Sequence, residues 1–246
     1  MKIVLTNDDG YLADGILFLE TYFLSKGHEV YTIAPDKERS GASHSLTFRD
    51  SIKLVKTEAN KWVLNSTPAD CIHFGFLGIL PIRPDVVISG INHGYNLGVD
   101  TIYSGTVGAA RQAALSGIPS IALSSAVINN TINSPLIKNF FDIHLDQIFN
   151  QLSTDYVINI NFPHCSYADL KGIKQTRLSH KHAYSDNLVT FDSPQQGRYY
   201  WINGEKPNFD TDENTDSGAI NADYISITLI NPMPEVNKKV LTIDDI

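Results

Sequence analysis

Residues 1–35, MKIVLTNDDGYLADGILFLETYFLSKGHEVYTIAP, decide the fold. The apolar run from Lys2 to Thr6 predicts a buried strand, and the segment from Gly15 to Lys26 carries apolar residues at helical spacing. A second apolar run extends from Glu29 to Ala34, and Gly27 stands where a helix commonly ends. Strand, helix and strand in this order predict a βαβ unit, in which the two strands are parallel.

The same alternation continues along the next part of the chain. The predicted elements are a strand at Asp85–Ser89, a helix at Gly105–Ser116, a strand at Ser120–Leu123, a helix at Ile137–Leu152 and a strand at Tyr156–Asn161. Strands that alternate with helices imply an α/β fold, a mostly parallel sheet flanked by helices on both faces.

The sequence changes in character after Pro163. Short strand-like runs at Arg198–Ile202 and Tyr224–Leu229 are separated by polar, turn-rich segments, one of them the acidic stretch Asp210–Asp216. We therefore divide the chain into a catalytic core, residues 1–163, and a β-rich C-terminal extension, residues 164–246. We expect the extension to pack on a neighbouring subunit as an oligomerisation arm.

Composition excludes some classes of partner. The formal net charge is -8 and the isoelectric point is near 5.4, whereas a protein that binds duplex nucleic acid or an anionic membrane needs a basic surface. We find neither a signal-peptide pattern nor a transmembrane stretch, and expect a cytoplasmic protein. Cys71 and Cys165 match no zinc or redox spacing and are interpreted as reduced thiols.

The segment Asn7-Asp8-Asp9-Gly10 follows the first predicted strand. Ligands of open parallel sheets bind beyond the carboxyl ends of the strands, where this segment lies. Two adjacent carboxylates repel each other, so a hard divalent cation such as Mg²⁺ or Mn²⁺ is the natural partner. The alternative is that one Asp caps the next helix while the other is solvated.

Three further polar segments follow other predicted strands. Residues Ala34–Ser43 form a polar loop with hydroxyls, which on its own also suits an ordinary surface turn, and Ser89–Gly98 contains three glycines and offers Asn92 as a neutral oxygen ligand. Residues Tyr103–Ala110 open a helix whose N-terminus can bind an anion, although Ser104 is also a simple N-cap. His44 and His93 lie inside these loops and are candidates for substrate contact or proton relay.

An acidic pair, neutral oxygen ligands and an anion-binding helix end together suit metal-assisted hydrolysis of a phosphate ester. At this point the chain resembles the survival protein E (SurE) family of metal-dependent nucleotidases, over essentially its whole length. The matching stretches are Ile3–Gly10, Ala34-Pro35, Arg39–Ser43, Thr67–Cys71, Ser89–Asn92, Gly94, Asn96–Gly98, Ile102–Val107, Asn159–Pro163, Thr215-Asp216, Ala219 and Tyr224–Thr228.

The resemblance implies a Rossmann-like α/β core and hydrolysis of nucleoside 5'- and 3'-monophosphates, with exopolyphosphatase activity in some members. It implies one divalent metal ion per subunit, Mg or Mn, held by Asp8, Asp9, Ser40 and Asn92. The catalytic candidates are Asp8, Asp9 and Asn92, and Asp9 is the candidate for proton transfer. The candidates for substrate and phosphate binding are Ser40, Gly41, Asn96, Ser104, Gly105 and Thr106.

The resemblance also implies a homodimer or homotetramer that exchanges C-terminal arms. Two stretches depart from the family pattern: Arg111-Gln112 replaces Glu-Gly, and Leu229-Ile230-Asn231 replaces a Pro-Leu ending. Neither stretch contains a proposed ligand, so the departures bear on packing and assembly.

Three other classes remain as alternatives. A Mg-dependent phospho-acceptor switch needs an acceptor Asp after a middle strand, where this chain has Ser89-Gly90-Ile91-Asn92. A phosphatase of the haloacid dehalogenase type needs two Asp separated by one residue, and Asp8 and Asp9 are adjacent. A non-catalytic nucleotide-binding protein is distinguished by a phosphate-release assay.

Overall fold

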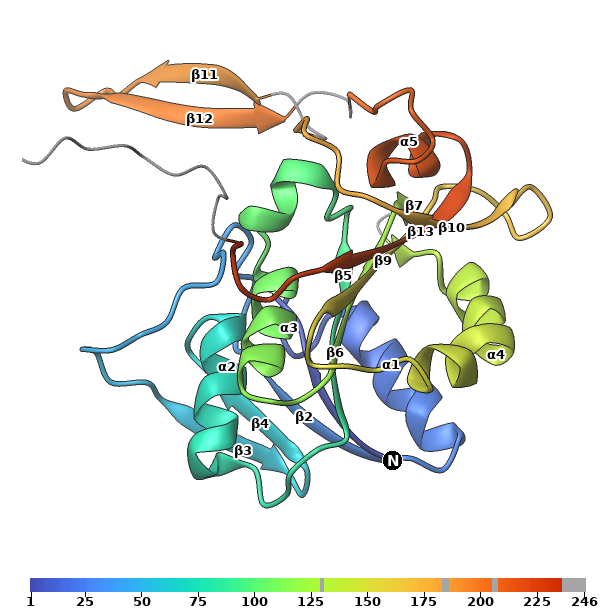
Figure 1. Ribbon diagram of the computed structural model, residues 1–246. Helices are drawn as coiled ribbons and strands as arrows, with labels where there is room; N and C mark the ends of the chain where they lie inside the picture. The colour runs from blue at the N-terminus through green and yellow to red at the C-terminus, as the bar shows by residue number, and fades with distance from the viewer. Residues whose placement is uncertain (129–130, 183–185, 205–207, 236–246) are drawn as a thin grey trace, which may run out of the picture.

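The structure is a computed structural model of the chain, and it describes residues 1–128, 131–182, 186–204 and 208–235 (Figure 1). Its main sheet has nine strands in the order β10-β13-β9-β6-β5-β1-β2-β4-β3. The strands are β1 (Lys2–Thr6), β2 (Glu29–Pro35), β3 (Leu54–Glu58), β4 (Lys61–Leu64), β5 (Val86–His93), β6 (Ser120–Ser125), β9 (Val157–Phe162), β10 (Gly172–Thr176) and β13 (Tyr224–Ile230).

The sheet is mostly parallel, as predicted. Only the pairings of β9 with β13 and of β3 with β4 are antiparallel among those described in this sheet. The predicted βαβ unit is confirmed, because β1 pairs in parallel with β2 through the helix α1 (Asp14–Ser25). β5 runs four residues beyond the predicted strand end at Ser89, with a register irregularity between Ser89 and Asn92, so Asn92 lies in the strand rather than in a loop.

Helices cover both faces of the sheet (Figure 1). α1 and α4 (Ser134–Phe149) lie on one face, and α2 (Pro68–Phe74) and α3 (Gly105–Leu115) lie on the other. The alternation of β1 follows from this arrangement: Ile3 and Leu5 are buried with α1 and α4, and Val4 is buried with α2 and α3. The near-continuous apolar run of β1 reflects burial on both faces of this strand.

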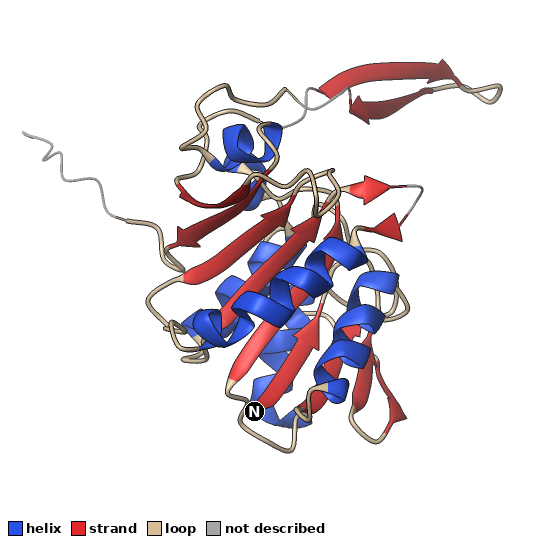
Figure 2. Cartoon of the chain, turned by 90° about the vertical axis from the view of Figure 1, so that its right-hand side faces the viewer, coloured by secondary structure: helices blue, strands red, loops and turns tan. Residues whose placement is uncertain are grey.

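Strands from both sides of the proposed domain boundary share the main sheet. β10 and β13 come after residue 163 and extend the sheet beyond β9, and the short helix α5 (Asp216–Asn221) precedes β13. β11 (Asp186–Asp192) and β12 (Arg198–Gly204) form a separate two-stranded ribbon that projects from the body of the molecule (Figure 2). A further small pair is β7 (Val127–Ile128) with β8 (Thr131–Ile132). The division at residue 163 stays a prediction.

Two smaller observations bear on the composition analysis. Cys71 and Cys165 are both free cysteines. None of the helices in the described part of the chain is long and apolar enough to span a bilayer.

Helix α1 packs so closely on β5 that its second residue must be glycine. A Cβ on Gly15 would lie 2.2 Å from the carbonyl oxygen of Ile91 and 3.0 Å from its nitrogen. Both atoms belong to the backbone of a central strand, so neither can move aside without disturbing the sheet next to Asn92.

We expect Gly15→Ala to lower the free energy of unfolding by about 2 kcal/mol, although Ala normally stabilises a helix relative to Gly. Urea denaturation followed by circular dichroism measures this change. Thr21→Ala, at an exposed position of the same helix, is the matched control and should alter stability by less than about 0.5 kcal/mol. A Gly15→Ala protein as stable as the wild type would show that the close packing of α1 on β5 is not required.

Candidate functional site

The carboxyl ends of β1, β2 and β5 meet the N-terminus of α3 around Asp8. The side chain of Asn7 donates to the carbonyl oxygen of Gly10 over 2.8 Å, which closes the turn after β1. The carbonyl oxygen of Asp8 accepts the backbone N–H of Arg39 over 2.7 Å, so the loop after β2 is fixed to the same turn. The sequence analysis expected these segments to converge, and the structure brings them together.

Asp8 lies directly beneath the first turn of α3. Its side chain accepts hydrogen bonds from the hydroxyl of Thr106 and, over 3.2 Å, from the backbone N–H of Thr106. A Cβ on Gly105 would lie 2.9 Å from the Cβ of Asp8, so only glycine permits this approach. Asp8 is 4% exposed as a result.

Burial changes the protonation of both acidic residues. Burial raises the pKa of Asp8 to about 6, with the nearby charge of Asp9 acting in the same direction and the hydrogen bond from Thr106 acting against it. Burial also raises the pKa of Asp9, while the charge of His93 lowers it. Among the described ion pairs none involves Asp8 or Asp9, so no Lys or Arg neutralises them.

β5 contributes Asn92 and His93 next to Asp9. The backbone N–H of His93 donates to Asp9 over 3.2 Å, and the side-chain nitrogen of Asn92 donates to the carbonyl oxygen of Gly94 over 3.0 Å. The Asn92 amide is therefore oriented through its nitrogen, and its oxygen is the atom that it can offer to a metal. The ring of His93 pairs with Asp14 at the start of α1.

The loop after β2 carries Ser40 and Gly41 at its exposed tip. The hydroxyl of Ser40 donates to Glu38 over 2.7 Å, so binding a metal requires this hydroxyl to exchange partners. Further along, the backbone N–H of Ser43 donates to the carbonyl oxygen of Tyr103 over 2.9 Å, which attaches the loop to the segment before α3. Gly41 has a φ of +72° at this tip, a conformation that favours glycine.

The predicted phosphate-binding segment starts α3. Ser104 is the N-cap and accepts the N–H of Val107 over 3.0 Å, so its capping role is observed. Capping does not compete with an anion for the helix dipole, which favours a negative charge at this end of α3. Thr106 uses both its hydroxyl and its N–H on Asp8 in this structure.

Asn96 stands apart from the other candidates. It is buried, its side chain donates to Ser124 over 2.8 Å, and its carbonyl oxygen accepts from the side chains of Asn159 and Asn161. These contacts fix the loop between β5 and α3. The phosphate-binding role of the Asn96 side chain stays a prediction.

The donor set fits a hard divalent cation. Asp8 and Asp9 supply two carboxylates that form no described ion pair with Lys or Arg, and Asn92 and Ser40 can add an amide and a hydroxyl oxygen. Oxygen ligands of this kind suit Mg²⁺ and Mn²⁺ better than softer metals. In the described part of the chain no cluster of three or more His, Cys, Asp or Glu side chains could hold a metal, so neutral oxygens must complete the coordination.

His44 contacts helix α3 rather than either carboxylate among the described hydrogen bonds. Its Nε2 lies 2.7 Å from the side-chain oxygen of Gln112 on α3, and the side-chain nitrogen of Gln112 lies 3.5 Å from Nδ1 of His73 on α2. His44 therefore connects the loop to two helices. Gln112 is one of the residues that depart from the family pattern. In this chain its side chain contacts His44 and His73.

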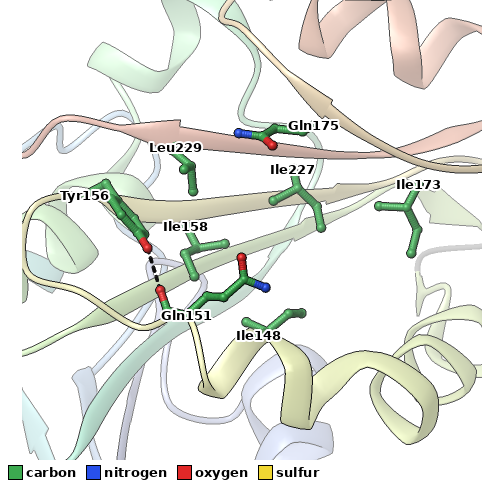
Figure 3. Close-up of a pocket in the computed structure, with 8 residues that line it drawn as sticks. All are labelled: Ile148, Gln151, Tyr156, Ile158, Ile173, Gln175, Ile227 and Leu229. Atoms are coloured by element: carbon green, nitrogen blue, oxygen red, sulfur yellow. Dashed lines mark hydrogen bonds between the residues drawn. The ribbon is translucent and has the colours of Figure 1, made fainter.

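Another hollow in the molecule has different chemistry. An apolar groove lies between the end of α4 and the strands β9, β13 and β10 (Figure 3), and the hydroxyl of Tyr156 donates to the carbonyl oxygen of Gln151 at one end of it. Its lining residues are Ile148, Gln151, Tyr156, Ile158, Ile173, Gln175, Ile227 and Leu229. None of them is charged, so the groove suits neither a metal nor a phosphate.

The sequence analysis assigned no role to Asp70, although it belongs to one of the quoted stretches. Asp70 is fully buried on α2 and accepts hydrogen bonds from Ser66, from the Thr47 N–H and hydroxyl (both 2.8 Å) and from the N-cap Thr67. Burial raises its pKa, but these hydrogen bonds outweigh burial and hold the pKa below the ordinary 3.8. The spacing Thr67-Pro68-Ala69-Asp70 is a capping-box pattern that could have identified α2.

We expect Asp70→Asn to lower the free energy of unfolding by about 2 kcal/mol at pH 7, because a buried charged acceptor is lost. The folded-state pKa is depressed, so the charge stabilises the fold above pH 3.8 and this contribution disappears as the pH falls through the folded-state value. The difference between wild type and Asp70→Asn should therefore shrink below that pH.

Urea denaturation at pH 7 and in acid measures the difference. Asp50→Asn, at an exposed position of the loop that contains Thr47, is the control and should match the wild type at both pH values. A constant deficit for Asp70→Asn at both pH values would contradict the stabilising role of its charge.

The chain was compared with known proteins. Residues 3–185 match the family described as survival protein SurE. The 5'-nucleotidase SurE of Thermosipho melanesiensis is 40% identical over 235 residues, which cover 94% of this chain and 91% of that protein. The 5'-nucleotidase SurE of Aquifex aeolicus is 39% identical over 227 residues, which cover 92% and 90%.

The fold agrees with these matches. The crystal structure of the SurE protein from Aquifex aeolicus superposes with a TM-score of 0.80 at 37% sequence identity, and the match covers 95% of this chain and 94% of that chain. The segments that converge on Asp8 are those on which the sequence resemblance was based. The chain belongs to the SurE family.

Proposed function

We propose that this protein is a divalent-metal-dependent 5'-nucleotidase, which hydrolyses nucleoside monophosphates to nucleoside and phosphate. The observation that carries the proposal is the adjacent pair Asp8 and Asp9, which forms no described ion pair with Lys or Arg, and whose buried member, Asp8, contacts the N-terminus of α3. The names of the relatives, 5'-nucleotidase SurE, support the same substrate class.

Asp8, Asp9, Asn92 and Ser40 would hold one divalent ion, Mg²⁺ or Mn²⁺. When bound, such an ion neutralises the two carboxylates, polarises a phosphoryl group and lowers the pKa of a bound water toward neutrality. The hydrogen bonds from Thr106 orient the Asp8 carboxylate, and the N–H from His93 orients Asp9. Asp9 is the candidate for a proton-transfer group.

The first turn of α3 and the tip of the loop after β2 form the proposed phosphate side of the site. Ser104, Gly105 and Thr106 surround the positive end of the helix dipole, which favours the phosphate of a monoester. Ser40 and Gly41 lie in the loop between Arg39 and Ser43, whose backbone N–H groups donate to the carbonyl oxygens of Asp8 and Tyr103. The proposal extends to 3'-monophosphates and to terminal phosphates of polyphosphate, since a helix N-terminus favours a phosphate group whatever it is attached to.

A phospho-acceptor switch is disfavoured by the position of Asn92. The end of the middle strand β5 carries Asn92, whose amide cannot accept a phosphoryl group as an Asp carboxylate does. Only a measurement of turnover distinguishes a nucleotidase from a non-catalytic nucleotide-binding protein. We also propose a cytoplasmic location, which the two free cysteines support, since reduced thiols persist in a reducing compartment.

The direct test is phosphate release from a panel of 5'- and 3'-nucleoside monophosphates and polyphosphate, with Mn²⁺ or Mg²⁺ and with a chelator as control. We expect Asp8→Asn to lower kcat/KM at least about 100-fold with the fold intact, since it removes a charged metal ligand. Asp155→Asn, at an exposed position before β9, is the matched control and should keep wild-type turnover. Wild-type turnover by Asp8→Asn at saturating metal would overturn the assignment.

We propose further that the ribbon β11–β12 is the oligomerisation arm. It projects from the body (Figure 2), and most of its large apolar side chains are exposed: Leu188, Phe191, Tyr199, Tyr200, Trp201 and Ile202. A two-stranded ribbon alone is marginally stable in water, so a partner surface is needed to cover these side chains.

We expect light scattering after gel filtration to give a dimer or tetramer for the wild type. Replacing Tyr200 and Trp201 with Ser should lower the mass toward that of a smaller assembly, because the covered apolar surface is lost. The control replaces Tyr167 and Met233 with Ser; both are exposed and lie outside the ribbon, so this variant should keep the wild-type mass. An unchanged assembly in the Tyr200 and Trp201 variant would contradict the role of the ribbon.

A further inference from the structure

Two aromatic rings stack on one another, and one of them belongs to the residue before the N-cap of α3. The rings of Tyr103 and His182 are inclined by only 16°, with their centroids 6.2 Å apart. Tyr103 directly precedes Ser104, the N-cap of α3, so the Cα atoms of Tyr103 and Ser104 are about 3.8 Å apart. Tyr103 is 53% exposed, so much of its aromatic surface is open to solvent.

The two rings come from different parts of the chain. Tyr103 ends the short 3-10 helix η2 (Gly98–Ile102), whereas His182 lies in the C-terminal extension, after β10. Nδ1 of His182 lies 3.2 Å from the carboxylate of Asp100 on η2. The side chain of His182 is 57% exposed, so the pair contributes little to a packed core.

The backbone beneath the pair is closely packed. The fully buried Asp216 accepts the N–H of Gly98 over 2.7 Å and the N–H of Ser179 over 2.9 Å, and so joins the segment before His182 to the start of η2. A Cβ on Gly98 would lie 2.7 Å from the carbonyl oxygens of Ser179 and Lys181. The two rings therefore stand on segments that are held together by backbone contacts.

We propose that Tyr103 and His182 form the nucleobase subsite, on which the base of the substrate stacks while its phosphate lies at the start of α3. The inference rests on the proposed function and specifies how that site recognises its substrate. Nucleoside monophosphates separate base and phosphate by one ribose, and Tyr103 is the residue that directly precedes the N-cap of α3. Since every base has a π-face, stacking selects for a base without selecting which one.

The test compares a substrate that has a base with one that lacks it. We expect Tyr103→Ala to raise KM for adenosine 5'-monophosphate at least tenfold more than KM for ribose 5-phosphate, and to change kcat for adenosine 5'-monophosphate less than threefold. Tyr103→Phe keeps the ring and should restore the wild-type KM. The carbonyl oxygen of Tyr103, which accepts the N–H of Ser43, is present in all these variants.

His182 provides a second, independent variant. We expect His182→Ala to raise the KM for adenosine 5'-monophosphate selectively, and His182→Phe, which keeps a ring but not the contact with Asp100, to stay near the wild type. Tyr167→Ala removes an aromatic side chain of similar exposure, 49%, outside the site, and should leave both substrates unaffected. Thermal melting of each variant checks that the fold is kept.

The outcomes separate this inference from the proposed function. Equal changes in KM for the two substrates in Tyr103→Ala, or full activity of Tyr103→Ala on the nucleotide, would overturn the subsite and leave the nucleotidase proposal standing. If the wild type released no phosphate from any ester, the proposed function would fail. Calorimetry with adenosine 5'-monophosphate and ribose 5-phosphate would then test the subsite. If the wild type binds the nucleotide more tightly than the sugar phosphate, and Tyr103→Ala loses this difference, the base stacks on Tyr103. If the wild type binds both compounds equally, the subsite is refuted.

Discussion

The contact between Asp8 and the first turn of α3 is the constraint on which the site depends. The backbone of Gly105 touches the Asp8 side chain, and Thr106 donates two hydrogen bonds to its carboxylate. This contact places a buried acidic group at the positive end of a helix dipole, next to a second carboxylate. The carbonyl oxygen of Asp8 also holds the loop after β2, so one residue positions three segments of the site.

Much of the fold could be predicted, because the central strands and the long helices carry clear periodic patterns. The βαβ unit and the strands β6, β9 and β13 lie within a few residues of their predicted positions. The strands β3 and β10 were missed, since edge strands are short and face solvent, and their residues carry no continuous apolar run. Where the sequence lacks a continuous apolar run, strand pairing is seen only in the three-dimensional structure.

The candidate site could be predicted in part, for a related physical reason. Parallel strands bring their carboxyl ends to one edge, so the convergence of Asp8, Asp9 and Asn92 follows from the order of the elements. The sequence could not show that the Asn96 side chain donates to the buried hydroxyl of Ser124, nor that Thr106 uses its hydroxyl on Asp8. Both facts depend on which face of the chain each side chain occupies. The role of Asp216 likewise appears only when the C-terminal extension packs on η2.

The central claim is that Asp8 and Asp9 share one divalent ion with neutral oxygen ligands. Anomalous diffraction from crystals soaked in Mn²⁺ tests it most directly. The account predicts one strong peak per chain, about 2.2 Å from oxygens of Asp8, Asp9 and Asn92. Absence of a peak at saturating Mn²⁺, or a peak bound by other residues, would contradict the account.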